Sequence, residues 1–213
     1  MIKQHKKQLI LTSIVTLIPM VMGLLLWKQL PDLLPSHWDI NGNVDNWSSK
    51  AFTVFGMPVF LLALQWFAVF ASSSDPKYTN YHPKLLAVVL WICPLISLIC
   101  SGLSYTTALG FPLQIERIVP VLLGLMFVIL GNLMPKSRQT YTMGIRLPWT
   151  LASEENWNKT HRLAGKIWVA GGIVSIALAF LNCLWLFLAV LVLMAAIPTL
   201  YSYLHYRHHE KNN

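Results

Sequence analysis

The sequence predicts an all-α fold, a polytopic membrane protein whose chain crosses the bilayer as six transmembrane helices. Only 11% of the 213 residues are charged and 55% are hydrophobic, whereas a soluble domain carries about a quarter charged residues. Several apolar runs reach the roughly 20 residues that a helix needs to cross a bilayer. These runs lack the alternation of transmembrane β-strands, which excludes a closed barrel and leaves helices.

The apolar runs give the expected spans: 9–27, 52–71, 85–109, 118–134, 167–180 and 184–204. Together they form a single integral membrane domain, residues 1–213, with loops at 28–51 and 135–166. Lysines precede the first run, as in a signal peptide. The run is too long for one, however, and no small-residue cleavage site follows, so we expect an uncleaved span.

The basic residues predict the orientation of the spans. All sixteen Lys and Arg residues except Lys28, Lys50 and Arg117 fall on the side of the amino terminus. The positive-inside rule therefore places both termini and the 135–166 loop in the cytoplasm, and the 28–51 loop outside. Basic residues beside spans face anionic lipid, so the net charge of +8 predicts membrane lipids and no nucleic acid as partners.

The outer loop contains a turn signal and three metal-ligand residue types. Asn41-Gly42 lies between short apolar stretches, which favours a small β-hairpin. His37, Asp39 and Asp45 could together hold a divalent cation. Sparse ligands in a turn more often hydrogen-bond within the loop, so we expect no metal and no other cofactor. An extracellular contact is the better hypothesis for this loop, because loops on rigid scaffolds carry binding.

The cytoplasmic loop presents an arginine from a turn. Gly144 permits unusual backbone angles, and Pro148 restricts the residue before it to an extended conformation. Arg146 lies between them and Trp149 follows. The arginine could anchor at lipid phosphate, reach into the bundle to join helices, or bind an anionic group. A structural role is favoured, because interfacial arginines usually anchor.

An amphipathic helix is expected before span five. Ser153 is a good N-cap and acidic residues occupy the first turn. One face carries aromatic and small residues, and another is basic: Trp157, His161, Ala164 and Trp168 on the first, Lys159, Arg162 and Lys166 on the second. This pattern predicts a helix at the membrane surface that runs into span five. His161 would be half-buried there, and packing is favoured over pH sensing.

Several classes of function lack their motifs. No Asp, Glu, Lys or Arg lies well inside an expected span, although ion-coupled transporters usually need such residues. The sequence has no P-loop, no H-E-x-x-H zinc motif and no nucleophile–base pattern, so we expect a protein that is not an enzyme. The three cysteines show no metal spacing or disulfide framework.

Two segments resemble the SdpI-like family of bacterial membrane proteins. The first contains Gly131-Asn132, then Gly144-Ile145-Arg146-Leu147-Pro148-Trp149-Thr150-Leu151, then Trp157 and His161–Lys166. The second, residues 34–50, resembles the small domain of unknown function in the amino-terminal half of such proteins. It carries His37-Trp38, Gly42 and Asp45. The number of spans and the placement of the loops agree with this family along nearly the whole chain.

The resemblance implies a protein of the bacterial cytoplasmic membrane that confers immunity to a membrane-active peptide toxin, or bacteriocin. It also implies signalling, because the family's founder is thought to hold a helix-turn-helix repressor at the membrane. The candidate functional residues it marks are Asn132, Arg146, Pro148, Trp149, Thr150, Trp157, His161 and Arg162, with His37, Trp38, Gly42 and Asp45 in the outer loop. Immunity should then be lost in Arg146→Ala.

Two alternatives remain. A transporter or flippase of a small amphiphile would need a continuous polar cavity. Its candidate lining is Gln65, Asn132, Ser97, Ser101 and Ser104, although the serine spacing equally suits packing against a neighbouring helix. A membrane sensor without direct immunity would depend on the basic face Lys159, Arg162 and Lys166.

Overall fold

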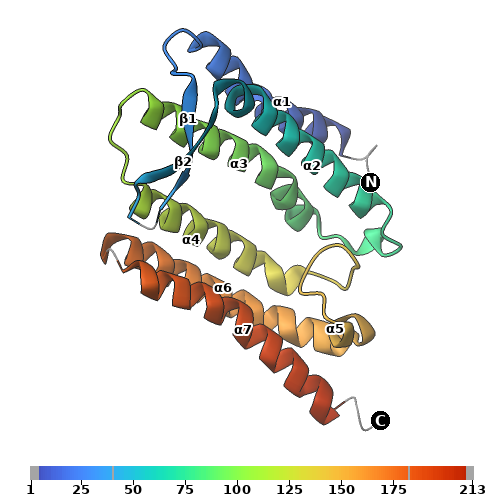
Figure 1. The fold of residues 1–213 in the computed structure, drawn as a ribbon. Coiled ribbons are helices and arrows are strands. Elements are labelled where there is room, and N and C mark those ends of the chain that lie inside the picture. Colours follow the sequence, from blue (N-terminus) through green and yellow to red (C-terminus); the bar gives the residue numbers. More distant parts are fainter. Residues whose placement is uncertain (1–4, 40, 182, 210–213) are drawn as a thin grey trace. The chain divides into compact units, whose positions relative to one another are not determined.

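The structure, a computed structural model, describes residues 5–39, 41–181 and 183–209. Among these residues, six helices are long and apolar enough to cross a membrane. They are α1 Lys6–Leu25, α2 Met57–Ser73, α3 Pro83–Ala108, α4 Ile115–Leu133, α6 Glu154–Leu181 and α7 Leu184–His209 (Figure 1). The expected all-α class and the six spans are therefore confirmed, with boundaries that differ by a few residues except at α6.

The remaining elements are short. An antiparallel hairpin consists of β1 (Leu33–Trp38) and β2 (Val44–Ser49), and a π-helix at Phe52–Gly56 leads into α2. Single turns of 3-10 helix lie at Tyr78–Asn80 and Met134–Lys136, and a short helix α5 spans Pro148–Ala152. The chain divides into two compact units, which we describe separately: unit 1 is Met1–Ser73 with Ala87–Ile115, and unit 2 is Ser74–Leu86 with Glu116–Asn213.

The core of unit 1 joins the hairpin to the helices. Leu30, Leu34, Val54 and Tyr105 form one buried cluster at the base of the hairpin. Nearby, the ammonium group of Lys50 donates hydrogen bonds to the carbonyl oxygens of Trp27, at 3.2 Å, and Leu30, at 2.7 Å. A cation at the carboxyl end of α1 is favourable because unpaired carbonyls and the negative end of the helix dipole meet there.

Buried polar side chains hold the helices of unit 1 together. The amide nitrogen of Gln65 on α2 donates to the Thr12 hydroxyl of α1 at 2.7 Å, and its oxygen accepts from the Thr16 hydroxyl at 3.0 Å. Ser97 of α3 donates to the Thr16 carbonyl at 2.8 Å. Interhelical hydrogen bonds of this kind stabilise helix association where lipid provides no hydrophobic driving force.

In unit 2, α4 and α6 approach closely through two pairs of glycines. A Cβ on Gly131 would lie 2.9 Å from the Gly165 carbonyl oxygen, and one on Gly124 would lie 2.7 Å from that of Gly172. The two glycines of each helix are seven residues apart, so they lie on one face of that helix. Small residues let helix backbones approach this closely in membranes.

The 135–166 segment, expected to be a loop with one helix, is more ordered than the sequence suggests. α6 begins at Glu154 and continues to Leu181 without interruption, as expected for a helix that runs into span five. The Ser153 hydroxyl accepts from the Asn156 N–H at 3.2 Å, which confirms the predicted N-cap. The expectation of a loop at Pro148 is wrong, because Pro148 opens α5, where its fixed φ and missing N–H suit a first helical turn.

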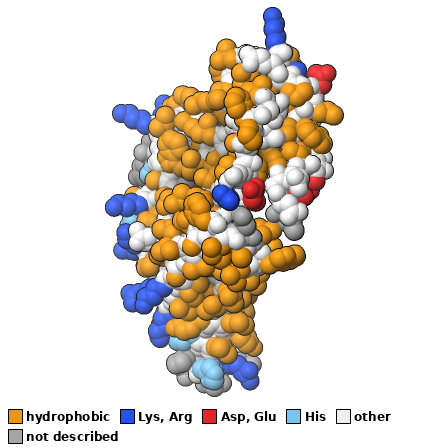
Figure 2. Space-filling view, turned by 90° about the vertical axis from the view of Figure 1, so that its left-hand side faces the viewer, with side chains coloured by type: hydrophobic (Ala, Val, Ile, Leu, Met, Phe, Trp, Pro, Cys, Tyr) orange, Lys and Arg blue, Asp and Glu red, His pale blue; other side chains and the backbone are white. Residues whose placement is uncertain are grey.

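Large apolar side chains lie on the outside of the helices. Phe60, Phe67 and Phe70 of α2 and Trp185 of α7 are among the exposed ones. Hydrophobic side chains cover much of the face shown in Figure 2. A soluble monomer rarely exposes apolar patches of this extent, whereas lipid solvates them.

Candidate functional site

A buried carboxylate organises the polar end of unit 2, which we call the polar cap (residues 74–82 and 134–161). The Asp75 side chain accepts hydrogen bonds from the backbone N–H groups of Lys77, Tyr141 and Thr142 at 2.8–3.0 Å. The hydroxyls of Tyr81, at 3.0 Å, and Thr142, at 2.9 Å, also donate to it. Burial raises the pKa of this carboxyl, but the surrounding donors outweigh burial, so its pKa lies below the usual value of 3.8.

Gln139 ties the loop of the polar cap to α5. Its amide nitrogen donates to the carbonyl oxygens of Thr150 and Leu151, both at 2.9 Å. Its amide oxygen accepts from the Lys77 ammonium, and its backbone carbonyl accepts from Asn80 at 2.9 Å. Asp75 and Gln139 were both missed by the sequence analysis. The only signals were an Asp-Pro turn after span two and a lone glutamine in a basic loop.

His161 is a structural residue inside the polar cap. Its Nε2 accepts from the Ile145 N–H at 2.9 Å, and its Nδ1 bonds to the Trp157 carbonyl at 2.8 Å. A neutral imidazole protonated at Nδ1 satisfies both contacts. The side chain is 1% exposed, so the expectation of a half-buried interfacial histidine is wrong. The loop before α5 folds back over the helix and covers the ring, and the predicted packing role fits this position.

Gly144 allows the loop to cross His161. Its φ is +112°, and a Cβ there would lie 2.6 Å from His161 Nε2 and 2.7 Å from the Trp157 ring. A side chain would therefore meet both a strained backbone and two buried rings. The Trp157 ring stacks on His161 with centroids 4.1 Å apart, and its Nε1 donates to the Ser137 carbonyl at 2.9 Å.

Arg146 points away from the buried part of the polar cap. The side chain is exposed, and its Nη1 donates to the Tyr141 carbonyl of the same loop at 2.9 Å. The hypothesis that Arg146 reaches into the helices is therefore wrong for this structure, since its guanidinium closes the loop instead. Thr150 is fully buried; its hydroxyl accepts from the Leu147 N–H and donates to the Ile145 carbonyl, each at 2.8 Å.

A second polar network joins α5, α6 and α7. The Trp149 indole donates to the Ser202 hydroxyl at 2.7 Å, and that hydroxyl donates to the Asn156 amide oxygen at 2.8 Å. Asn156 also donates to the Ser202 carbonyl at 3.1 Å and accepts from Thr160 at 3.0 Å. The motif residue Trp149 thus fixes the short helix to the last span. Asn156 and Ser202 were not foreseen, because their relation appears only when α6 and α7 pack.

The other motif residues of unit 2 lie at its surface. Arg162 is exposed on α6, as are Lys159 and Lys166, so the predicted basic face exists. Lys159 pairs with Glu155 one turn earlier at 2.5 Å. Asn132 is exposed on α4 and is not part of the buried network formed by the other motif residues.

The hairpin of unit 1 confirms the predicted turn. The Asp39 carboxylate accepts from the backbone N–H groups of Asn41 and Asn43 at 2.9 and 2.8 Å, and Gly42 has a φ of +81°. These backbone donors lower the Asp39 pKa below its usual value. Ile40, which precedes the predicted Asn-Gly turn, lies outside the described residues. Trp38 ends β1 opposite Val44 and is partly buried.

His37 and Asp45 form a pair on the exposed surface of the hairpin. The distance from His37 Nδ1 to the Asp45 carboxylate is 2.6 Å. Asp39 is engaged with its own turn, so the three residues do not converge. Among the described residues, no group of three or more His, Cys, Asp or Glu side chains could hold a metal ion.

A groove of about 620 Å³ lies at the base of the hairpin, within unit 1. It is lined by Pro31, Asp32, Leu33, Trp47, Thr107 and Ala108. Leu33 and Trp47 are 57% and 51% exposed. The groove therefore offers an apolar surface with an indole at its side, which suits a partner with an apolar face.

Two segments of the chain match known protein families. Residues 136–202 match the SdpI/YfhL protein family, and residues 14–62 match a domain of unknown function (DUF1648). The carboxyl-terminal part of the chain is therefore similar to the SdpI/YfhL family. Immunity protein SdpI of Bacillus subtilis (strain 168) is 28% identical over 208 residues, which cover 94% of this chain and 97% of that protein. No solved structure gives a significant match.

The similarity to these proteins, together with the six apolar helices, identifies a multi-pass protein of the bacterial cytoplasmic membrane. The SdpI/YfhL match begins in the polar cap and ends in α7, so it contains the His161 and Trp149 networks. The second match contains the carboxyl-terminal part of α1, the whole hairpin and the start of α2. The orientation of the termini and the depth of the first turns of α6 in the membrane stay predictions.

The residues proposed for a transport cavity are used differently. Gln65 and Ser97 are buried and hydrogen-bonded between helices of unit 1, and Ser104 donates to the Pro35 carbonyl at 2.6 Å. Ser101 is also fully buried. These positions support the packing role that the serine spacing indicated, and they give a transporter no specific support.

Proposed function

We propose that this protein confers immunity to a membrane-active peptide toxin, by binding the toxin outside the cytoplasmic membrane. The observation that carries the proposal is the match to immunity protein SdpI over 94% of the chain. The match extends over the hairpin as well as the polar cap, and these are the two parts that could contact a partner.

The apolar groove at the base of the hairpin is the proposed site of toxin capture. A membrane-active peptide presents an apolar face, and the exposed Leu33 and Trp47 offer a matching surface. Trp47 supplies a large contact area with few rotatable bonds, as anchors at interfaces do. The His37–Asp45 pair links the two strands of the hairpin, and Asp39 fixes the turn.

A challenge assay tests the proposal. Bacteria sensitive to a membrane-active peptide toxin would express the wild type, Trp47→Ala or His37→Ala at matched membrane levels. We expect wild-type cells to survive and Trp47→Ala to lose most protection, since removing an interface anchor costs about 2 kcal/mol or more in binding. His37→Ala should lose less, because an exposed ion pair contributes about 1 kcal/mol at most.

Trp185→Ala is the matched control, because Trp185 is also highly exposed but lies at the start of α7. It should protect like the wild type. Arg146→Ala belongs in the same series and should weaken protection by loosening the polar cap. If the wild type protects against no membrane-active peptide, the immunity proposal is wrong. If Trp47→Ala protects fully, the capture site lies elsewhere.

Signalling is the second part of the proposal. The exposed basic face of α6, formed by Lys159, Arg162 and Lys166, would hold a helix-turn-helix repressor once toxin is bound. Its test is co-purification of a repressor from toxin-treated cells with the wild type and with Lys159→Gln/Lys166→Gln. Recovery of the repressor with the wild type alone would support the docking surface. Equal recovery, or none, would contradict it.

A further inference from the structure

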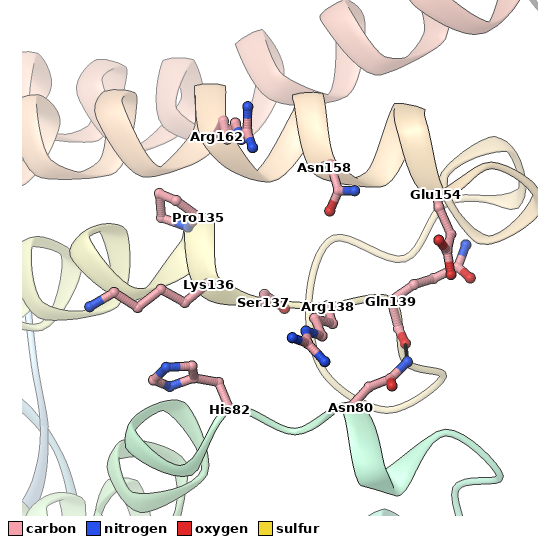
Figure 3. Close-up of a pocket in the computed structure, with 10 residues that line it drawn as sticks. All are labelled: Asn80, His82, Pro135, Lys136, Ser137, Arg138, Gln139, Glu154, Asn158 and Arg162. Carbon is pink, nitrogen blue, oxygen red and sulfur yellow. Dashed lines mark hydrogen bonds between the residues drawn. The ribbon is translucent and has the colours of Figure 1, made fainter.

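A pocket of about 600 Å³ lies in the polar cap of unit 2, beside the amino-terminal turns of α6 (Figure 3). Its lining comes from three segments: Asn80 and His82 before α3, Pro135, Lys136, Ser137, Arg138 and Gln139 after α4, and Glu154, Asn158 and Arg162 on α6. Its volume lies within the range of small-ligand sites. Unlike most such sites, it is lined mainly by polar and charged side chains.

The charges of the pocket are unbalanced. Lys136, Arg138 and Arg162 contribute three positive charges, and Glu154 is the one acid in the lining. Within the described residues, none of the three cations forms an ion pair. Figure 3 shows Arg138 near the centre of the view, with Arg162 above it and Glu154 at the far end beside Gln139. In this view Lys136 and Arg162 lie on the side opposite Glu154, and Arg138 lies between them and the acid.

The neutral residues add hydrogen-bonding groups without adding charge. Asn80 and Asn158 carry amides, and Arg138 and Arg162 each present a planar fork of N–H donors. The buried Nδ1 of His82 has no hydrogen-bond partner among the described residues. Two guanidinium groups and an ammonium around one space suit a tetrahedral oxyanion, because guanidinium binds phosphate in a bidentate manner.

The pocket also lies where a phosphate would be found. It is bounded by the carboxyl end of α4, at Leu133, and the amino end of α6, at Glu154. Both helices are candidate spans, so their ends come close to the headgroup region of a bilayer. Pairing with an anion would also relieve the repulsion among three cations gathered in one pocket.

We propose that this pocket binds a phosphate group, carried either by an anionic lipid headgroup or by a soluble phosphate compound. Arg138 and Arg162 grip the phosphate oxygens, and Lys136 adds a third positive charge. Binding would join the loop after α4 to α6, and it requires neither the toxin nor the outer hairpin.

Two binding measurements on the purified full-length protein test this proposal and separate the two sources. The first is calorimetric titration with inorganic phosphate, in phosphatidylcholine nanodiscs at constant ionic strength. The second is native mass spectrometry after equilibration with equal amounts of phosphatidylglycerol and phosphatidylcholine. Arg138→Gln and Arg162→Gln should each weaken binding about tenfold or more, as expected for loss of a charge-assisted hydrogen bond.

Lys84→Gln is the matched control, because it removes one positive charge two residues after His82 but outside the pocket lining. It should leave binding within about twofold of the wild type, as expected for a distant, screened charge. Glu154→Gln should tighten binding by removing the one acid of the pocket. A gain of affinity cannot arise from misfolding.

Each outcome decides the question. Phosphate binding that weakens in both arginine variants supports a soluble phosphate compound. Retention of phosphatidylglycerol that falls in both variants, without binding of inorganic phosphate, supports a lipid headgroup. No binding in either measurement overturns the proposal. An equal loss in Lys84→Gln also overturns it, because the effect would then follow net charge rather than the pocket.

Discussion

Asp75 is the residue on which the polar cap depends. A buried carboxylate is costly unless donors surround it. Here the backbone N–H groups of Tyr141 and Thr142 both donate hydrogen bonds to the Asp75 carboxylate. The side chain is 3% exposed, and its pKa is lowered although burial alone would raise it. One charge thereby fixes two loops that are more than sixty residues apart in sequence.

Replacing Asp75 with Asn should destabilise unit 2 by roughly 1–3 kcal/mol. The substitution replaces one carboxylate oxygen with an NH2 group, which then faces N–H and O–H donors and cannot accept their hydrogen bonds. The midpoint of thermal unfolding in detergent, followed by tryptophan fluorescence, measures the loss. Asp32→Asn is the control, since the Asp32 carboxylate is fully exposed and its ion pair with Lys50 is long, at 3.5 Å. An unchanged midpoint in Asp75→Asn would contradict the anchoring role.

The difference in unfolding midpoint between the wild type and Asp75→Asn should depend on pH. The Asp75 pKa is lower in the folded state than its usual 3.8, so its contribution is fully present above that value. The contribution is lost as pH falls through the folded pKa. The difference in midpoint between wild type and Asp75→Asn should therefore stay constant from neutral pH down to about pH 5 and shrink only below 3.8. A difference that disappears already near pH 6 would exclude Asp75 as its source.

At the scale of elements, α4 and α6 depend on glycine for their close approach. Gly131 faces Gly165, and Gly124 faces Gly172. Each missing side chain allows backbone atoms to approach within a distance that a Cβ would not permit. The helix pair gains dispersion contacts and backbone contacts in return, which matters in lipid, where hydrophobic burial provides little.

Gly131→Ala should weaken the α4–α6 contact although alanine favours a helix. Its Cβ would lie 2.8 Å from the Val169 backbone nitrogen, and backbone cannot move away cheaply. We expect a loss of about 1–3 kcal/mol, as for overpacking of a core, measured as a lower unfolding midpoint.

Gly102→Ala is the control for this substitution. Gly102 also lies in a candidate span, but a Cβ there meets nothing within 4 Å. That variant should be as stable as the wild type or more so, because alanine has the higher helix propensity. If both variants behave alike, the close approach does not matter for stability.

At the scale of the whole molecule, the distribution of charge predicts how the protein lies in the membrane. By the positive-inside rule, the hairpin between α1 and α2 is expected outside the membrane. The polar cap is expected in the cytoplasm, together with most Lys and Arg residues. Both proposals depend on this orientation, since toxin capture requires an external groove and repressor docking requires an internal basic face.

Cysteine labelling tests the orientation. In a chain whose native Cys93, Cys100 and Cys183 are replaced, Asn43→Cys should react with a membrane-impermeant maleimide in intact cells. Thr79→Cys should react only after the cells are opened. Both positions are outside the spans, so access to the reagent is the only difference expected. The reverse pattern would invert the topology and remove the basis for external capture.

The amino-acid sequence alone is enough to predict the class of the protein, the six spans and the hairpin. These follow from local composition: long apolar runs have one stable form in lipid, and Asn-Gly at a turn favours a hairpin whatever the rest of the chain does. Gly144 was expected to allow unusual backbone angles, and its φ of +112° agrees with that expectation.

The contacts that the individual side chains make become visible only in the folded protein. His161 is a buried hydrogen-bond acceptor, and the Arg146 guanidinium closes its own loop. Asp75 and Gln139 hold the segments of the polar cap together, and no strong local pattern marks them for this role. The phosphate pocket likewise draws its charges from segments before α3, after α4 and on α6. The physical reason is that hydrogen bonds and cavities between distant segments depend on how helices and loops pack, and neither periodicity nor composition encodes that packing.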